Sequence, residues 1–369
     1  MTTYRRALAV ATASAAAAAG LALAAPSAMA TLTSPGAVYV LSNQVEGNAV
    51  IAFPRSADGL LSAPEAFATG GTGTGGGLGS QGAVIVDDAV RYLYAVNAGS
   101  DSITSFRITP HGLVRVDVEP SNGDRPTSVT VDGDLLYVLN AGSNEVTGFR
   151  VRGGDLAPIS GSTQPISGPA AAPGQVSFTP DGDQLIVAER GTQQLGVYPV
   201  DTDGVAGSPS FVPSSGAVPF GFDFDNKGHV IVSEAAGTPG GSAVSSYEIG
   251  DGDLDLISAS MPTTEGAACW IVTTTNGKFA YSGNAGTASV TGFRVGVDGS
   301  LTILDEDGKT GEALVGVTDL AVSRDSQYLY GRLGGNGTVG VWAIAADGSL
   351  TDLGPVPGLP AGTAGIAAT

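Results

Sequence analysis

Five polar residues occupy matching places in successive copies of a repeated pattern, and they are the first candidates for chemistry. Each stands at the end of a short apolar run that is typical of a β-strand: Asn97, Asn140, Glu189, Glu234 and Asn284. If the copies form a ring, side chains at matching positions are expected to converge around its centre. Glu234 and Glu189 could then exchange protons with a ligand as catalytic residues. The three asparagine amides are candidates for binding that ligand.

The same pattern allows other roles. Amide and carboxylate oxygens suit a hard cation such as calcium, although no metal ligand can be assigned from the sequence. A purely local role also fits, because an asparagine at a strand end often caps its own turn, as in the Asn-Ala-Gly triplets that begin at Asn97, Asn140 and Asn284. Arg125, in a Gly-Asp-Arg-Pro loop before an expected strand, is a candidate for binding an anion.

The elements that must position these residues come from the repeat itself. Residues 136–150 read as a strand, a polar turn and a second strand, and related segments run along the whole chain. An aromatic residue near the end of the second strand marks each copy: Phe53, Phe106, Phe149, Tyr198, Tyr247, Phe293 and Trp342. Seven copies at a period of roughly 40–55 residues predict an all-β protein, a seven-bladed β-propeller.

Each copy divides into four antiparallel strands. In the third copy we expect strands over residues 127–131, 135–140, 146–151 and 156–160, separated by Asp-Gly and Gly-Gly turns. Apolar and polar residues alternate within them, as they do in a β-meander.

The two ends of the repeat region complement one another. Residues 37–40 resemble a second strand with no first strand before it, and residues 365–368 resemble a first strand with nothing after it. We therefore predict that the C-terminal strand joins the N-terminal blade and closes the ring, which leaves no exposed sheet edge.

Three Gly-rich or Pro-rich insertions, at residues 70–79, 161–173 and 235–242, are expected to widen one rim of the ring. The first does not read as a phosphate-binding loop, because no Lys-Ser or Lys-Thr follows it. A flexible rim loop is the expectation.

The first 30 residues read as a secretory signal peptide: Arg5-Arg6, an apolar run and an Ala-Met-Ala end. We expect a secreted protein whose propeller domain covers residues 31–369, with the Sec or Tat route left open. The net charge of −19 argues against nucleic acid and anionic membranes as partners, so after cleavage we expect no membrane contact. We expect a monomer whose partner is a small lactone or carboxylate, or another extracellular molecule.

Nucleophilic catalysis finds little support. Cys269 is the only cysteine and is expected to be buried and inert. Of the two histidines, His111 is expected in a turn and His229 at the start of a second strand, both on the face opposite the strand-end residues. No Ser-His-Asp set can be assembled.

The units, with turns such as Thr179-Pro180-Asp181-Gly182 and the strand end Val187-Ala188-Glu189-Arg190-Gly191, resemble the lactonase family of seven-bladed propellers. That family includes the propeller type of 6-phosphogluconolactonase and the carboxymuconate lactonizing enzyme. The resemblance covers residues 31–369 and implies a lactone-hydrolysing or lactone-forming activity.

The chain departs from the family pattern where the resemblance places basic residues. Gly174 stands where a histidine is usual, and Val218-Pro219-Phe220-Gly221 lacks the usual arginine and histidine. The Ser233-Glu234 strand end is kept, so the resemblance carries over only Glu234, as acid or base.

Three functions follow. The first is a propeller that lacks the usual catalytic set and binds a ligand or partner. The second is a lactonase or cycloisomerase that acts on a small lactone or carboxylic acid at the channel mouth through Glu234. The third is a calcium-dependent lactone hydrolase, in which the metal replaces the missing basic groups.

Overall fold

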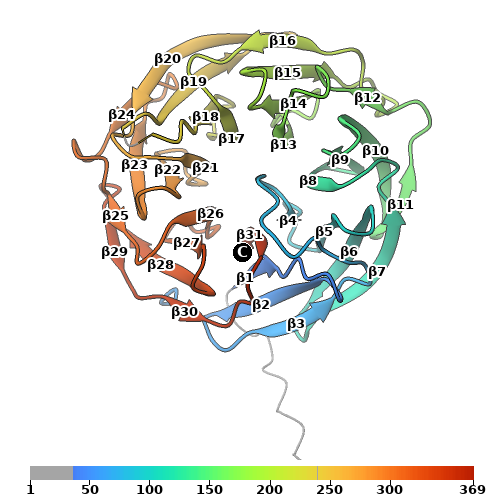
Figure 1. Cartoon of the computed structure of the whole chain (residues 1–369), viewed down its shortest axis with the longest axis horizontal. Coiled ribbons are helices and arrows are strands. Elements are labelled where there is room, and N and C mark those ends of the chain that lie inside the picture. The colour runs from blue at the N-terminus through green and yellow to red at the C-terminus, as the bar shows by residue number, and fades with distance from the viewer. Residues whose placement is uncertain (1–35, 239) are drawn as a thin grey trace, which may run out of the picture. The chain divides into compact units, whose positions relative to one another are not determined.

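The computed structural model describes residues 36–238 and 240–369, which form seven antiparallel β-sheets arranged in a ring (Figure 1). The expected all-β, seven-bladed propeller is confirmed. No helix long and apolar enough to cross a membrane occurs in these two stretches. The predicted signal peptide, residues 1–30, lies outside the described residues.

Each blade has four main strands. The innermost are β31 (Ala364–Ala368), β4 (Val84–Val86), β8 (Pro126–Asp132), β13 (Pro173–Phe178), β17 (Pro219–Phe224), β21 (Ala268–Thr273) and β26 (Val317–Val322). The second strands are β1 (Gly36–Leu41), β5 (Tyr92–Asn97), β9 (Leu135–Asn140), β14 (Gln184–Glu189), β18 (Val230–Glu234), β22 (Phe279–Asn284) and β27 (Tyr328–Leu333). We number the blades 1 to 7 in the order of these second strands.

The outer strands complete the blades. The third strands are β2 (Ala49–Arg55), β6 (Ser102–Thr109), β10 (Glu145–Arg152), β15 (Gln194–Pro199), β19 (Ala243–Ile249), β23 (Ser289–Val295) and β28 (Thr338–Ile344). The fourth are β3 (Glu65–Ala68), β7 (Gly112–Pro120), β11 (Asp155–Pro158), β16 (Ser210–Pro213), β20 (Leu254–Pro262), β24 (Leu301–Ile303) and β29 (Leu350–Asp352). Short β12 (Gln164–Pro165), β25 (Gly311–Glu312) and β30 (Val356–Pro357) also pair with third strands.

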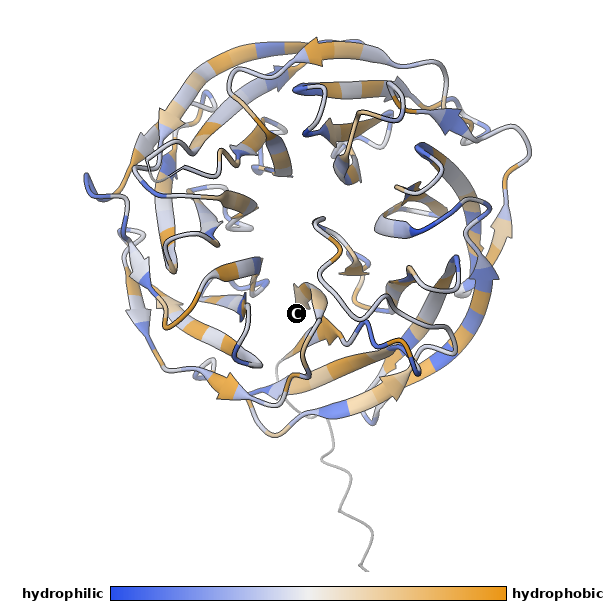
Figure 2. Ribbon diagram, in the orientation of Figure 1, coloured by the Kyte–Doolittle hydropathy of each residue, from blue (hydrophilic) through white to orange (hydrophobic). Residues whose placement is uncertain are grey.

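Position within the blade decides how apolar a strand is. β9 is buried along nearly its whole length, because its two faces pack against the blades on either side. β3, at the outer edge of blade 1, is mostly exposed. Figure 2 shows the result: hydrophobic residues lie along the strands, and many turns are hydrophilic.

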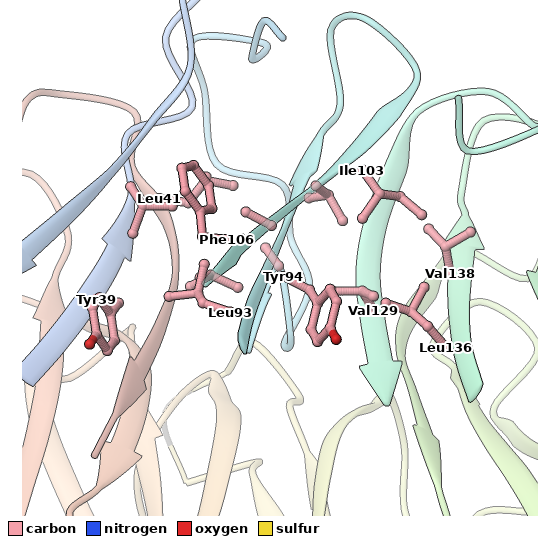
Figure 3. Close-up of a cluster of buried hydrophobic side chains, with 14 of the residues drawn as sticks. Tyr39, Leu41, Leu93, Tyr94, Ile103, Phe106, Val129, Leu136 and Val138 are labelled. Atoms are coloured by element: carbon pink, nitrogen blue, oxygen red, sulfur yellow. The ribbon is translucent and has the colours of Figure 1, made fainter. Parts of the chain in front are cut away.

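The core lies between the blades. Figure 3 shows one part of it, where β1, β5, β6, β8 and β9 of blades 1 to 3 contribute side chains. The labelled residues of this cluster are Tyr39, Leu41, Leu93, Tyr94, Ile103, Phe106, Val129, Leu136 and Val138. Facing sheets bury such side chains because neither face alone can exclude water from them.

Tyrosines in three second strands also bind the next blade. Each hydroxyl donates a hydrogen bond to a glycine carbonyl in the turn between the neighbour's third and fourth strands: Tyr137 to Gly204 at 2.8 Å, Tyr281 to Gly348 at 2.8 Å and Tyr330 to Gly59 at 2.9 Å. The last bond joins blade 7 to blade 1. The same contact therefore holds the ring together at ordinary blade boundaries and at its closure.

The ring closes as predicted. β31 pairs with β1, with Ala367 opposite Tyr39 and Ile366 opposite Val40. The backbone N–H of Ala37 donates to Thr369 Oγ1 at 2.9 Å. The last strand of the chain is thus the innermost strand of blade 1 (Figure 1).

Candidate functional site

The strand-end asparagines are buried, and each donates hydrogen bonds to groups of its own blade or of the link before it. Asn97 also bonds to blade 1, because its Oδ1 accepts from Asn48 Nδ2 at 3.0 Å. Asn97 Nδ2 donates to Ser102 Oγ at 3.1 Å and to Thr104 Oγ1 at 2.9 Å. Asn284 makes the corresponding bonds to the hydroxyls of Ser289 and Thr291, at 3.0 and 2.9 Å.

Asn140 differs in one partner. Its Nδ2 donates to the carbonyl of Ser121 at 3.1 Å, in the link from blade 2, and to Thr147 Oγ1 at 3.4 Å. The amide oxygens of Asn140 and Asn284 have no hydrogen-bond partner among the described residues, and their ligand-binding role stays a prediction.

The expected convergence of these residues around the channel is wrong. Side chains of a strand stand perpendicular to its sheet, and in a ring of radial sheets that direction leads toward the neighbouring blade. The innermost strand of each blade also lies between the second strand and the axis. Residues at matching positions of the repeat therefore have similar surroundings, each within its own blade, and do not meet at the channel.

Glu189 and Glu234 occupy equivalent positions but differ in their hydrogen bonds. Both oxygens of the Glu189 carboxylate accept hydrogen bonds, which come from the backbone and hydroxyl of Ser167, the hydroxyl of Thr192 and the amide of Gln194. Such a set holds a carboxylate in place. Glu189 therefore has the surroundings of a structural anchor between β14 and the preceding link.

The Glu234 carboxylate differs at one of its two oxygens. Its Oε1 accepts from the N–H of Gly216 at 2.8 Å and from the hydroxyl of Ser245 at 2.7 Å. Its Oε2 is buried without a partner among the described residues. A Cβ placed on Gly216 would lie 2.1 Å from that oxygen, so the link before β17 directly covers it.

A second group of residues lies at the start of the inner strands. The guanidinium of Arg190 lies over the Phe220 ring, 4.8 Å from its centroid, and Phe220 packs edge-on against Trp270 at 5.0 Å. Arg190 Nε donates to the carbonyl of Ala172 at 2.8 Å. Burial, and secondarily the charge of exposed Arg125, lower the pKa of Arg190. Arg190 thus places a positive charge beside the start of the inner strands β13 and β17.

Cys269 lies beside this group and is unsuited to nucleophilic attack. Burial raises the pKa of its thiol to about 12, although the charge of Arg190 acts in the opposite direction. The thiol therefore stays protonated at neutral pH, which agrees with the expected inertness, although Cys269 is half-buried and not fully buried.

The channel itself is crossed by the segment that precedes β4. Figure 1 shows this segment reaching toward the centre of the ring. The Gln81 side chain donates to the carbonyl of Ile271 at 2.8 Å and accepts from the N–H of Ile271 at 3.1 Å, on the opposite side. Gln175 makes the same pair of bonds to Phe222, at 2.9 and 2.8 Å. The insertion at residues 70–79, expected to be a flexible rim loop, thus leads into Gln81, whose hydrogen bonds link the segment before β4 to β21.

The side-chain amides of these two glutamines form the hydrogen bonds that a neighbouring strand would otherwise form. A side-chain amide has one donor and one acceptor in the geometry of a peptide group, so it can pair with the free inner edge of β21 or β17. This explains why the innermost strands tolerate unpaired edges at the channel.

Replacing Gln81 with leucine is expected to lower the free energy of unfolding by about 2–3 kcal/mol, because two buried backbone groups of Ile271 lose their partner. Urea denaturation measures the change. Gln327→Leu, at an exposed position, is the matched control and is expected to alter stability by less than about 0.5 kcal/mol. Equal effects of the two substitutions would contradict the role of Gln81.

Gln81 bounds a chamber of about 330 Å³ inside the ring. Its lining combines apolar residues of β4, β26 and β31 with two carboxylates, half-buried Asp223 and buried Asp319. Asp223 accepts hydrogen bonds from Thr273 and from Phe224, whereas Asp319 Oδ2 has no partner among the described residues. Burial raises the pKa of Asp319 to about 7, with the charge of Arg332 opposing the shift.

Within the described stretches, no group of three or more His, Cys, Asp or Glu side chains is arranged to hold a metal ion. The calcium hypothesis of the sequence therefore has no built site to support it, and it stays a prediction.

A comparison with known protein families shows which family the chain belongs to. The family model described as "Lactonase, 7-bladed beta-propeller" matches residues 22–249. The chain belongs to the lactonase family of seven-bladed β-propellers. This confirms the resemblance drawn from the repeat and its strand ends.

Solved structures agree with this lactonase-family fold. A protein of Bacteroides uniformis assigned as a 6-phosphogluconolactonase is 16% identical, with a TM-score of 0.71 over 90% of this chain and 99% of that one. A Lactobacillus plantarum protein is 18% identical, with a TM-score of 0.71 and coverages of 90% and 99%. The periplasmic gluconolactonase of Pseudomonas aeruginosa is 20% identical, with a TM-score of 0.69 and coverages of 89% and 98%. At these identities the likeness establishes the fold alone. No curated protein matches the chain.

Three residues of this lactonase-family propeller were missed from the sequence: Gln81, Gln175 and Asp319. Each stands near the start of an inner strand, where the local pattern is short and irregular. An indication existed in the sequence for two of them: Gln81 stands shortly before the apolar inner strand β4, and Gln175 lies near the start of inner strand β13. Asp319, within Val317–Val322, interrupts an apolar run and could have been noted for that reason.

Proposed function

We propose that this lactonase-family propeller hydrolyses a small lactone. Family membership supports the reaction class, and the names of two structural relatives agree with it. The observation that carries the proposal furthest is the buried Oε2 of Glu234, a carboxylate oxygen with no partner among the described residues, at the strand end that the family resemblance singles out. Positive charge for a developing carboxylate is available from arginines such as Arg190.

Glu234→Gln is expected to lower kcat/KM for a hydrolysed lactone by about 10²–10⁴-fold, the usual loss when a general acid or base is removed. A pH-stat measures the acid released from a panel that includes glucono-1,5-lactone and simple γ- and δ-lactones. Each assay is run with calcium and with a chelator, so that a calcium-dependent hydrolase is recognised by loss of turnover in the chelator.

Glu189→Gln is the matched comparison, since it makes the same change at the equivalent position of blade 4. Because its carboxylate only anchors a link, this variant is expected to lose stability while keeping kcat/KM within about threefold. If the wild-type protein hydrolyses no lactone of the panel, the enzyme proposal is wrong and the ligand-binding propeller becomes the better hypothesis.

We also infer that the protein is exported by the predicted signal peptide, residues 1–30. N-terminal sequencing of protein recovered from the culture medium is expected to begin at Thr31. Recovery of the intact chain from the cell interior would contradict export.

A further inference from the structure

The boundary between blades 5 and 6 departs from a pattern that two other blade boundaries share. In blades 3 and 6 an arginine follows the aromatic residue of the third strand. Its guanidinium donates to the carbonyl of an aspartate in a turn of the next blade: Arg150 to Asp203 at 2.7 Å and Arg294 to Asp347 at 3.1 Å. In blade 5 the corresponding residue of β19 is Glu248. The charge at this position is therefore reversed.

The residue that begins the second strand changes at the same place. A Cβ placed on the glycine of the next blade's turn would meet the side chain of that residue in each case: Leu135 from Gly204 at 2.4 Å, Phe279 from Gly348 at 2.5 Å and His229 from Gly299 at 2.7 Å. The turn of blade 6 thus packs over His229 as the other turns pack over an apolar side chain. Blade 5 has a histidine and a glutamate where blades 3 and 6 have an apolar residue and an arginine.

The imidazole of His229 is held in one orientation by Asp225. The side chains of these two residues are only 9% and 1% exposed. Asp225 Oδ1 accepts from the backbone N–H groups of Lys227 and His229, at 2.8 and 2.9 Å, and its Oδ2 lies 2.7 Å from His229 Nδ1. A carboxylate at this distance accepts a hydrogen bond, so Nδ1 carries the proton and the neutral ring has its lone pair on Nε2. Metal-binding imidazoles are commonly supported by a carboxylate in this way.

Nε2 of His229 faces the carboxylate of Glu248, with Oε2 at 3.6 Å. Both atoms are acceptors when Nδ1 holds the proton of the ring, so they repel unless a cation lies between them. A proton fits this spacing poorly, because N–H···O hydrogen bonds have N···O distances of about 2.7–3.2 Å. Two ligand atoms at about 2.0–2.2 Å from one Zn²⁺ ion lie about 3.3–3.6 Å apart at the tetrahedral angle. The spacing therefore suits a metal ion better than a proton.

A second carboxylate lies beside Glu248. Asp255 of β20 is directly opposite Glu248 in the pairing of β19 with β20. Like charges at such positions destabilise a sheet, and a cation bound to both removes that repulsion. Asp255 is exposed and Glu248 is 65% exposed, so the Asp255 carboxylate is free to turn and a cation can enter from solvent. Only His229 and Glu248 are already in place, which agrees with the lack of a group of three ligands in the described stretches.

We propose that His229 and Glu248, completed by Asp255 and water, bind a divalent transition-metal ion such as Zn²⁺ at the boundary of blades 5 and 6. Imidazole nitrogen and carboxylate oxygen are ordinary ligands of such ions. The ion supplies the positive charge that Arg150 supplies in blade 3. Its role is structural, because β18 separates His229 from Glu234 by about 16 Å, at about 3.3 Å for each residue.

Zinc binding is measured by isothermal titration calorimetry on protein freed of metal with a chelator, and the visible absorption of Co²⁺ is the second probe. The wild type is expected to bind one equivalent of Zn²⁺ with a micromolar or lower Kd and to melt several degrees higher when zinc is present. His229→Gln and Glu248→Gln are each expected to weaken binding by more than about tenfold, and Asp225→Asn by about 10–100-fold. His111→Gln and Glu65→Gln, at exposed positions, are the controls and are expected to bind zinc as the wild type does.

A double variant separates the metal ion from the charge that it supplies. His229→Leu combined with Glu248→Arg installs the pair that blade 3 has in Leu135 and Arg150. This protein is expected to bind no Zn²⁺ at the boundary, and its melting temperature is expected not to respond to zinc. It is also expected to be at least as stable as the zinc-free wild type, because the arginine can donate to the turn of blade 6.

Each outcome decides the proposal. A wild type that takes up neither Zn²⁺ nor Co²⁺ at stoichiometric concentration overturns it. Equal uptake by the wild type and Glu248→Gln also overturns it and indicates an adventitious ion only, on a protein whose net charge is −19. If His229→Gln does not fold, Glu248→Gln decides, since weaker binding supports the site and equal binding contradicts it. Lactone turnover is not the readout, so neither result affects the proposed hydrolysis.

Discussion

Deletion of residues 364–369 is expected to abolish stable folding or to lower the free energy of unfolding by on the order of 5 kcal/mol or more. These residues carry β31, the innermost strand of blade 1, so the deletion removes the whole ladder to β1. It also removes Ile366, which is buried against β1 and blade 7. A loss of this size is comparable to the total stability of many domains, about 5–15 kcal/mol.

Circular dichroism with urea denaturation and gel filtration measure this effect. The deleted protein is expected to unfold at lower urea or to elute as an aggregate, because the open ring exposes the inner edge of β1. Val356→Ala in short β30, at the periphery of blade 7, is the comparison and is expected to cost about 1 kcal/mol. A deleted protein as stable as that variant would show that the ring does not depend on its closure.

Stability is expected to fall by about 4 kcal/mol between pH 4 and pH 7 because of Asp319. Its pKa is about 7 in the folded protein against an ordinary value of 3.8, and each pH unit of difference corresponds to about 1.4 kcal/mol. The folded state therefore holds this proton over a pH range in which the unfolded state has lost it. The contribution is fully present below pH 4, declines as pH rises and is lost above pH 7.

Asp319→Asn is expected to remove this decline, because an amide does not titrate in this range. Urea denaturation at a series of pH values compares the two proteins. Asp325→Asn is the control. Burial acts to raise the pKa of Asp325, but the hydrogen bond from Ser323 and the charge of Arg55 help to lower it below its ordinary value. The contribution of Asp325 to the free energy of unfolding therefore changes with pH in the opposite direction. The wild-type decline is expected to persist in that variant. A wild-type and an Asp319→Asn protein with parallel pH profiles would exclude a buried, proton-binding Asp319.

The predicted fold followed from local patterns that repeat. The strands expected over 127–131 and 135–140 correspond to β8 and β9, because alternation and Asp-Gly turns are set by neighbouring residues. Gly182 illustrates the turns: it has a φ of 76°, and its N–H donates to the carbonyl of Thr179 at 2.9 Å. The closing strand was predictable because the first blade lacks one strand and the last copy of the repeat is followed by one extra strand. Pairing of the two completes the first blade.

The candidate site was less predictable. Glu189 and Glu234 occupy the same place in the repeat. Both oxygens of Glu189 accept hydrogen bonds, whereas Glu234 Oε2 has no partner in the part of the chain that the structure describes. The difference depends on which residues the preceding links bring over each strand end. These links vary in length and composition, so the repeat does not predict them.

By itself, the sequence determined the number of blades, the order of strands within them and the way the ring closes, since hydrophobic alternation and turn chemistry act over a few residues at a time. Only the tertiary structure decided which polar groups face the channel. Gln81 reaches Ile271 across 190 positions of the chain, and Asp319 lies in a local register shift between β26 and β27. Contacts of this kind depend on how complete blades are packed around a common axis, which no short stretch of residues encodes.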